Sequence, residues 1–273
     1  FPRRSDNENS ILGETKTDEK GEFVIKVKLE KDDDVKGIQV NNYQVNASVT
    51  DINGETQFSE TSVKVASVSH YLEMSTINDA LTTDAIETTI TAKNYNGQSL
   101  PKPYQLKLVK LQEPDRVLRS NFENAVQNNP QLSYTDFIQK FPHDSYSKDD
   151  LIGNWKEVKV IKNWNNYSET KINFGKLEPG RYRAIAFNIE NQDTIQVKKD
   201  FSIWSPKELA KDQKPFLHVV QAKTTYKRGE IANFYLYSAI PDAVVNVFIQ
   251  DGRGKLIKET VKNVLIQYHA KLA

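Results

Sequence analysis

Two stretches of the chain repeat one pattern, and this repeat limits the possible fold more than any other feature. They run from Tyr43 to Val65 and from Tyr182 to Trp204, and each holds an alternating apolar and polar run, a polar turn and a second alternating run. Alternation with a period of two is typical of half-buried strands, and a turn between two such runs predicts a hairpin. A recurring hairpin favours an array of small β-sandwich modules over one large catalytic fold. We therefore expect extension, spacing or binding rather than chemistry.

The composition fits several thin β-sandwich cores. A chain of 273 residues has room for two or three domains, and a hydrophobic content of 38% with 12 Tyr and 12 Phe suffices for cores built from alternating residues. Lys and Arg number 37 against 36 Asp and Glu, so the net charge of +1 gives no reason to expect a nucleic acid or an anionic membrane as partner. The absence of Cys excludes disulfides, thiolate metal sites and a Cys nucleophile within this sequence, but it does not fix the compartment.

The two ends of the sequence suggest a piece of a longer protein. The chain starts at Phe1 without Met and stops at Ala273, directly after a run that reads as a strand. The sequence contains no apolar run of the roughly 18 residues that a membrane span needs, and no signal-peptide pattern. We expect an excised segment with no membrane span of its own.

The strand pattern divides the chain into three modules. Residues 1–66 predict a partial β-sandwich truncated at its N-terminus, with roughly four strands where a free-standing sandwich needs about seven. These strands include Phe23–Leu29, which follows a turn at Asp18–Gly21. Residues 67–204 predict a complete module, and residues 212–273 predict a partial one truncated at its C-terminus.

The second module shows the full set of strands expected for a sandwich. The alternating runs lie near residues 69–75, 86–94, 104–112, 156–163, 169–174, 181–189 and 194–204. The segment Leu177–Tyr182 resembles the corner before the sixth strand of immunoglobulin-like sandwiches, where a Tyr hydroxyl bonds back to nearby backbone. An ordinary turn followed by a strand Tyr is equally compatible with these residues.

One segment of the second module, near residues 114–150, predicts helix instead of strand. A first helix is expected to open at Pro114 and to place Leu118 and Phe122 on its apolar face. A shorter helix follows, with Ser133 as N-cap and Pro142 as its end. The aromatic residues favour packing of this insertion on the parent sandwich, with a dedicated recognition surface as the alternative. Packing would make Phe122→Ala more destabilising than a change at a polar neighbour.

The sequence offers no recognisable catalytic, cofactor-binding or metal-binding residues, so we assign none. The four histidines lie far apart, without the spacing of a helix or turn metal site: His70, His143, His218 and His269. The nearest approach to a cluster, His143-Asp144 with Asp149-Asp150, fits a solvated loop better.

Short motifs also fail to indicate chemistry. Asp32–Asp34 lacks the alternating ligands and central Gly of a calcium loop. Gly252–Lys255 lacks the spacing of a phosphate-binding loop, and it joins two strands as a hairpin turn. The triplets at Asn46 and Asn166 match glycosylation acceptors, but such triplets often arise by chance. We therefore expect no enzyme activity, no cofactor and no bound metal.

The three tryptophans are the remaining candidates for a binding site. Aromatic rings can form a platform on which sugars stack. Trp204 closes a predicted strand and is interpreted as core or inter-module packing. Trp155 and Trp164 flank one predicted strand, so core packing and sugar stacking both remain open for them.

Several segments together carry a family resemblance. They are Thr17–Phe23, Tyr43–Thr56, Ser62–Val65, Leu111–Leu118 with Phe141–Asp144, and Tyr226 with Gly229-Glu230. With these segments the chain resembles the macroglobulin-type β-sandwich domains of bacterial alpha-2-macroglobulin-like proteins, particularly those of Bacteroidetes. The resemblance implies a mainly β fold of tandem immunoglobulin- or Fn3-like sandwich modules with one helical insertion. It covers most of the chain, but the individual motifs are short and are shared with other Fn3-like modules.

The resemblance implies a role in a protease trap. Members of the family are protease inhibitors in which a bait segment is cleaved and the molecule closes around the protease, often with a Cys–Gln thioester that acylates the target. Since this chain has no Cys, the reactive centre cannot lie here. The chain is then expected to be non-catalytic scaffold in the cell envelope or outside the cell, with the other domains of its parent chain, and possible target proteases, as partners. The alternative is a surface adhesion or glycan-binding array of Fn3-like modules, and a less favoured one is an accessory region of a secreted hydrolase.

Overall fold

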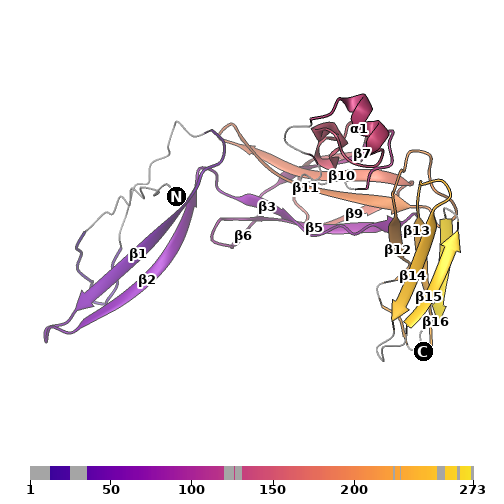
Figure 1. Ribbon diagram of the computed structural model, residues 1–273. Coiled ribbons are helices and arrows are strands. Elements are labelled where there is room, and N and C mark those ends of the chain that lie inside the picture. The colour runs from indigo at the N-terminus through magenta and orange to yellow at the C-terminus, as the bar shows by residue number, and fades with distance from the viewer. Residues whose placement is uncertain are drawn as a thin grey trace.

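The chain is mainly β and forms three β units in a row, with a bend at each end of the central unit (Figure 1). The computed structural model describes residues 13–24, 36–119, 126, 131–223, 225–227, 229–250, 256–262 and 265–271. Within these ranges, side chains are described as far as residue 248 and at residues 250 and 260. None of the helices in these ranges is long and apolar enough to cross a membrane.

The first unit is a long hairpin of β1 (Val40–Thr50) and β2 (Thr56–Ala66), which pair over their full length. Asp51 shapes the turn, since its Oδ1 accepts hydrogen bonds from Asn53 N at 2.8 Å and Glu55 N at 2.9 Å. The predicted turn at Asp18–Gly21 is confirmed by a hydrogen bond from Gly21 N to Asp18 O. Most of the predicted strand Phe23–Leu29 lies outside the described residues.

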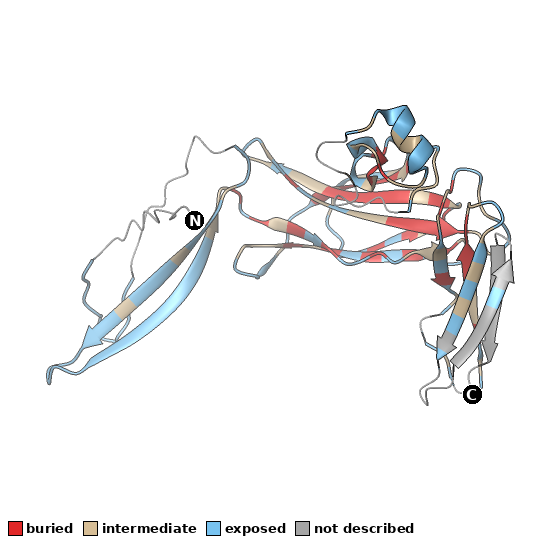
Figure 2. Cartoon of the chain, in the orientation of Figure 1, coloured by how far each residue is buried: buried red, intermediate tan, exposed pale blue. Residues whose placement is uncertain are grey.

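The hairpin is amphipathic but open to water (Figure 2). The register places Tyr43 opposite Val63 on one face, and Val45 and Val49 lie on that same face. Val45 is 40% exposed and Val63 is 39% exposed. Neither strand pairs with another of the described strands. A two-stranded hairpin is at best marginally stable alone, so its place in the molecule depends on how its base is held.

The central unit is a two-layer sandwich, and its seven predicted strands are confirmed. Two further strands have two residues each. In chain order the strands are β3 (Tyr71–Met74), β4 (Ala80–Leu81), β5 (Ile86–Lys93), β6 (Ser99–Leu100), β7 (Tyr104–Leu111), β8 (Glu157–Tyr167), β9 (Lys171–Gly175), β10 (Gly180–Glu190) and β11 (Asp193–Trp204). One sheet has the order β4-β11-β10-β7-β8, and in the other β5 pairs with β3, β6 and β9.

The core lies between these two sheets because each strand alternates inward and outward residues. On β5, Ile86 and Ile90 point inward between exposed neighbours. From the facing sheet, Leu106 and Leu108 of β7 are fully buried in the same cluster. Phe201 stacks on Tyr182 at 5.7 Å between ring centroids. The alternation seen in the sequence therefore predicts the core faces correctly.

The corner before β10 has the geometry that its sequence resembles. Tyr182 is buried, and its hydroxyl donates to the backbone oxygen of Glu178 at 2.8 Å, across the Pro179-Gly180 turn. Burial raises the pKa of Tyr182 to about 12, so the hydroxyl keeps its proton at physiological pH. This bond is the one that a tyrosine corner makes.

The insertion is only partly helical. The second predicted helix is confirmed as α1 (Tyr134–Lys140), with Ser133 as N-cap, its Oγ accepting from Asp136 N at 3.2 Å. Two short 3-10 helices, η2 (Lys148–Asp150) and η3 (Ile152–Asn154), follow. The helix predicted to open at Pro114 is wrong for residues 114–119, which are extended or bent. Phe122, and with it the predicted effect of its truncation, lies outside the described residues.

Tertiary contacts explain why residues 114–119 are not helical. Leu118 forms an isolated parallel bridge with Pro215, which lies beyond the end of the sandwich. Arg119 N donates to His143 O at 2.7 Å. Both contacts use backbone groups that a helix would occupy, so long-range pairing overrides the local apolar periodicity.

The third unit consists of β12 (His218–Gln221), β13 (Ile231–Tyr237), β14 (Val244–Gln250), β15 (Leu256–Lys262) and β16 (Leu265–Lys271). The strands β12-β13-β16 form one sheet, and β14 pairs with β15. The predicted hairpin turn around Gly252–Lys255 lies outside the described residues. The module boundaries at residues 66–67 and 204–212 stay a prediction.

The tyrosine corner gives a direct test of the central fold. We expect Tyr182→Phe to lower the free energy of unfolding by about 1 kcal/mol, because it removes one buried hydrogen bond and little packing. Tyr71→Phe is the control, since the Tyr71 hydroxyl has no hydrogen-bond partner among the described residues, and it should stay within about 0.5 kcal/mol. Urea denaturation measures both. Equal effects would contradict a structural role for the corner.

Candidate functional site

Aromatic, charged and hydrogen-bonding side chains connect the central sandwich to the third unit. We call this place the C-terminal joint. Trp204, the last residue of β11, is fully buried there. Its ring stacks on His218 at 4.5 Å and on Tyr237 at 4.8 Å between centroids. Leu81, Val220 and Tyr235 belong to the same cluster. The end of one β unit is thus part of the apolar core of the next.

The segment that connects the two units is bound at several points. Gln213 Nε2 donates to Ile203 O at 2.9 Å, and Tyr237 Oη donates to Ser205 O at 2.9 Å. Lys110 of β7 reaches Asp212 at 2.8 Å. Burial raises the pKa of Tyr237, so its hydroxyl remains a donor. These bonds fix a connection that would otherwise be an exposed loop.

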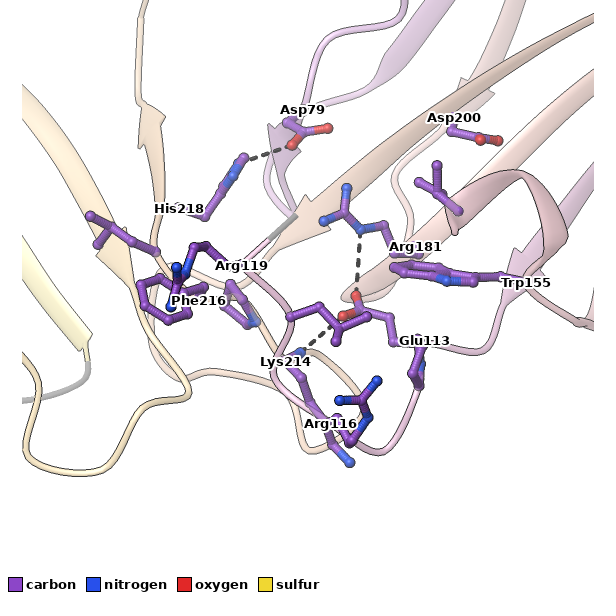
Figure 3. Close-up of a pocket in the computed structure, with 15 residues that line it drawn as sticks. Asp79, Glu113, Arg116, Arg119, Trp155, Arg181, Asp200, Lys214, Phe216 and His218 are labelled. Atoms are coloured by element: carbon purple, nitrogen blue, oxygen red, sulfur yellow. Dashed lines mark hydrogen bonds and ion pairs between the residues drawn. The ribbon is translucent and has the colours of Figure 1, made fainter. Parts of the chain in front are cut away.

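Asp79 contacts both units at the joint (Figure 3). Its Oδ1 accepts from Ser202 N of β11 at 2.7 Å, and its Oδ2 lies 2.9 Å from His218 Nε2 of β12. Burial would raise the pKa of the Asp79 carboxyl, but the contact with His218, with help from Arg181 and the Ser202 amide, lowers it below its ordinary value. Asp79 is therefore ionised at physiological pH and fixes one sheet end to the next unit.

Glu113 makes a second polar link at the joint (Figure 3). Its Oε2 accepts from Lys214 N at 3.0 Å, and its Oε1 lies 3.4 Å from Arg181 Nε. The side chain is 7% exposed. Burial raises the pKa of Glu113, and the positive Arg181 opposes this. The Arg181 guanidinium also lies over the Trp155 ring at 5.9 Å.

A cavity of about 430 Å³ lies between these groups. Its size and its place between two units are those of a ligand pocket. However, the charges in it already have partners within the chain: Arg181 faces Glu113, Arg116 pairs with Asp150 at 2.7 Å, and Lys214 pairs with Asp115 at 2.8 Å. Because these charges are already paired, the cavity fits a polar contact between two units better than a binding site for a charged ligand.

The insertion braces this joint from the side. On the outer face of the five-stranded sheet, Trp155 packs with Val109, Leu111 and Ile185. The guanidinium of Arg183 donates to Ile152 O at 2.7 Å and forms a pair of hydrogen bonds with Asp200. Beyond the sheet, Arg119 lies over the Phe216 ring and His143 contacts the edge of the same ring. The insertion therefore contacts both its parent sandwich and the segment that leads to the third unit.

The opposite end of the central sandwich forms the N-terminal joint, which holds the hairpin by polar contacts. The Asn96 side chain accepts from Lys64 N at 3.0 Å and donates to Lys64 O at 3.1 Å. Asn191 Nδ2 donates to Ser67 O at 3.3 Å, and Glu190 Oε1 accepts from Ser69 N at 2.7 Å. Asn96 and Asn191 belong to turns of the sandwich, and Glu190 is the last residue of β10.

The three histidines whose side chains are described do not come together. His70 lies at the N-terminal joint and His218 at the C-terminal joint, while His143 lies in the insertion with its Nδ1 2.8 Å from Val117 O. His269 lies in β16, and its side chain is outside the described part. Among the described residues no three His, Asp or Glu side chains are grouped as a metal site. The segment Asp32–Asp34 lies outside the described residues.

The acidic residues beside His143 serve the local fold. Asp150 Oδ2 accepts from Tyr146 N at 2.7 Å and pairs with Arg116. Asp149 lies in the short helix η2, where its N–H donates to Oγ of Ser147, the N-cap. These contacts show that Asp149 and Asp150 stabilise the conformation of the loop.

The tryptophans pack inside the protein. Trp155 is 6% exposed and Trp204 is fully buried. Trp164 is half-buried against the main core, with Phe174 at 5.9 Å and Lys162 over its ring. The interpretation of Trp204 as inter-module packing is confirmed. No surface platform of these three rings is present.

Sequence reasoning missed most residues of the C-terminal joint. Asp79, Glu113, Arg181 and Gln213 come from four distant parts of the chain, and each is an ordinary surface residue type. Only Trp204 and His218 were singled out, because their residue types are rare in this sequence. No spacing rule links the others, since the fold alone brings them together.

The sequence matches no protein-family model and no curated protein. Two solved structures of Escherichia coli alpha-2-macroglobulin are similar to the chain, one in the native conformation and one activated by porcine elastase. They align with 85% and 88% of the chain at 11% and 10% sequence identity, each with a TM-score of 0.27. The chain spans 14% and 27% of the length of these two chains. The similarity is weak and concerns the arrangement of β-strands alone.

A double-mutant cycle tests the link through Asp79. Asp79→Asn keeps an oxygen for Ser202 N, and His218→Phe keeps a ring against Trp204, so together they isolate the contact between the Asp79 carboxylate and the His218 ring. We expect a coupling of about 0.5–3 kcal/mol in the free energy of unfolding, measured by urea denaturation with tryptophan fluorescence. The pair Lys223–Glu230, whose side chains are 59% and 36% exposed, is the control and should couple less, because water screens it. Additive effects of the two substitutions would mean that Asp79 and His218 do not hold the joint.

Proposed function

We propose that the chain is a non-catalytic scaffold segment of a bacterial alpha-2-macroglobulin-like protease inhibitor. The observation that carries this proposal is the C-terminal joint, where Trp204 is shared between two β units and Asp79 and Glu113 bind the next unit. Such a joint fixes the relative orientation of successive modules. A trap that closes around a protease needs this property, because a change at one module must move the others as rigid bodies.

The sequence resemblance to macroglobulin-type domains supports the same role. In this proposal the chain supplies neither a bait segment nor a reactive thioester, and its direct partners are the other domains of a longer parent protein of the cell envelope or the extracellular space. The target protease is a partner of the whole assembly. The internal pairing of charges in the joint cavity further supports a mechanical role over ligand binding.

The adhesion alternative has lost its most specific support. The contact residues expected for sugar stacking were the tryptophans, and all three pack against cores. The insertion remains exposed at α1, where Tyr134 is 54% exposed. Phe141 at the C-cap of α1 is 45% exposed as well. A few scattered exposed aromatic residues are common on protein surfaces and do not favour an adhesin.

A two-substrate protease assay tests the proposal on the complete protein that contains this chain. We expect a protease incubated with it to lose activity toward a large protein substrate and to keep activity toward a short chromogenic peptide, because enclosure blocks access but not the active site. Trp204→Ala should weaken this discrimination while the protease still cleaves the inhibitor. Trp164→Phe, away from both joints, is the matched control.

Two outcomes would contradict the proposed function. Full activity toward both substrates would show that the protein encloses no protease. Loss of activity toward both would indicate an inhibitor that occupies the active site. If Trp204→Ala and Trp164→Phe behaved alike, the joint would not transmit closure.

A further inference from the structure

We propose that residues 67–70, the strap that joins the hairpin to the central sandwich, form an acid-sensitive latch: protonation of His70 releases the β1–β2 hairpin from its fixed orientation. This inference concerns the N-terminal joint and does not depend on the protease-trap proposal. It rests on a buried histidine whose two ring nitrogens have very different surroundings.

One ring nitrogen of His70 belongs to a polar network. His70 Nδ1 lies 2.9 Å from Ser69 Oγ and 3.3 Å from Glu190 Oε2. Ser69 also donates to Glu190 twice, from its hydroxyl at 2.7 Å and from its backbone N at 2.7 Å. The strap is therefore attached to the end of β10 through this serine, histidine and glutamate.

The other ring nitrogen is buried without a partner. The His70 side chain is 1% exposed, and Nε2 has no hydrogen-bond partner among the described residues. A neutral ring can occupy this place with a bare Nε2. A protonated ring carries N–H on both nitrogens, so it would bury a charged donor with no acceptor. Glu190 faces Nδ1 and cannot satisfy Nε2 at the same time.

The charged groups around the network favour the neutral ring. Burial lowers the pKa of His70, Glu190 opposes this shift, and Lys102 on the loop between β6 and β7 adds to it. Burial alone would raise the pKa of Glu190, but its hydrogen bonds from Ser69 hold that pKa below the ordinary value. The neighbouring phenols are Tyr71 and Tyr95, and burial raises the pKa of Tyr95. Glu190 thus stays ionised over the range in which His70 takes up its proton.

The sign of the effect follows from linkage. Because the pKa of His70 is lower in the attached strap than in water, the released strap binds the proton more tightly. The ratio of released to attached strap therefore rises as the pH falls below about 6.5, by at most about tenfold per pH unit. Release lets water reach Nε2, at the expense of the contacts that Ser69 makes with Glu190.

The experiment measures the orientation of the hairpin by distances between spin labels. The chain has no Cys, so Gln57→Cys at the hairpin tip and Lys198→Cys on β11, both exposed positions, place two labels unambiguously. At about pH 7.5 we expect one narrow distance population, and at about pH 5 a second, broader population that grows with a midpoint below about 6.5. Near-ultraviolet circular dichroism of the same samples reports whether the sandwich stays folded.

Two substitutions at His70 separate titration from packing. His70→Phe keeps the ring volume, and His70→Asn keeps a polar group near the place of Nδ1, but neither side chain titrates. Both should keep a single narrow population at either pH, whereas the control His143→Phe in the insertion should respond as the parent does. An unchanged distribution at about pH 5 would overturn the latch. So would broadening in both His70 variants, or loss of the sandwich signal together with the distance change.

Discussion

The stack of Trp204 between His218 and Tyr237 is the contact on which the arrangement of the units depends. Trp204 ends β11, so its backbone belongs to the five-stranded sheet while its ring lies in the core of the third unit. Rotation of either unit would open the stacked faces and expose aromatic surface to water. Its Nε1 has no hydrogen-bond partner among the described residues, so packing rather than a polar bond holds the ring. Packing of this ring therefore acts together with the polar links of Asp79 and Glu113 in orienting the two units.

The insertion makes this joint stiff because of where β7 lies. One face of β7 enters the sandwich core through Leu106 and Leu108, and the other face carries Val109 and Leu111 outward. An outward apolar face needs cover, and Trp155 of the insertion supplies it. The insertion also contacts the joint, where Leu118 bridges to Pro215 and Arg119 and His143 lie against the Phe216 ring. The insertion thus both covers the outer apolar face of β7 and contacts the segment that leads to the third unit.

The sequence predicts the fold better than it predicts the joints. Period-two alternation located all seven main strands of the central sandwich, whereas the Pro179-Gly180 turn before Tyr182 left a tyrosine corner and an ordinary turn equally open. Ser133 and Pro142 bounded α1 correctly. These successes concern residues whose local neighbours decide their conformation. The first predicted helix failed at Leu118, because its backbone pairs with a residue about a hundred positions away.

The joint residues could not be found in the same way. Asp79 and His218 interact only because β4 pairs in parallel with the end of β11, a contact between distant strands that leaves no periodic mark in the sequence. A carboxylate between two strands looks like any solvated turn residue. Tryptophan differs, since a large apolar ring at a strand end needs a covering surface wherever the chain leads. The large ring of Trp204 therefore indicated a contact between modules, whereas the charged residues of the joint did not.

The two joints of the central sandwich differ in the physical nature of their contacts, and this difference decides what can move each of them. At the C-terminal joint, stacked rings make the contact, and the charged groups around them have partners within the chain. At the N-terminal joint, side-chain amides and carboxylates grip the backbone of Lys64, Ser67 and Ser69. Net hydrogen-bond energies are small because water competes for the same groups. A hairpin with an open apolar face, held by bonds of this kind, is the part of the molecule whose orientation solvent and partners can most readily change.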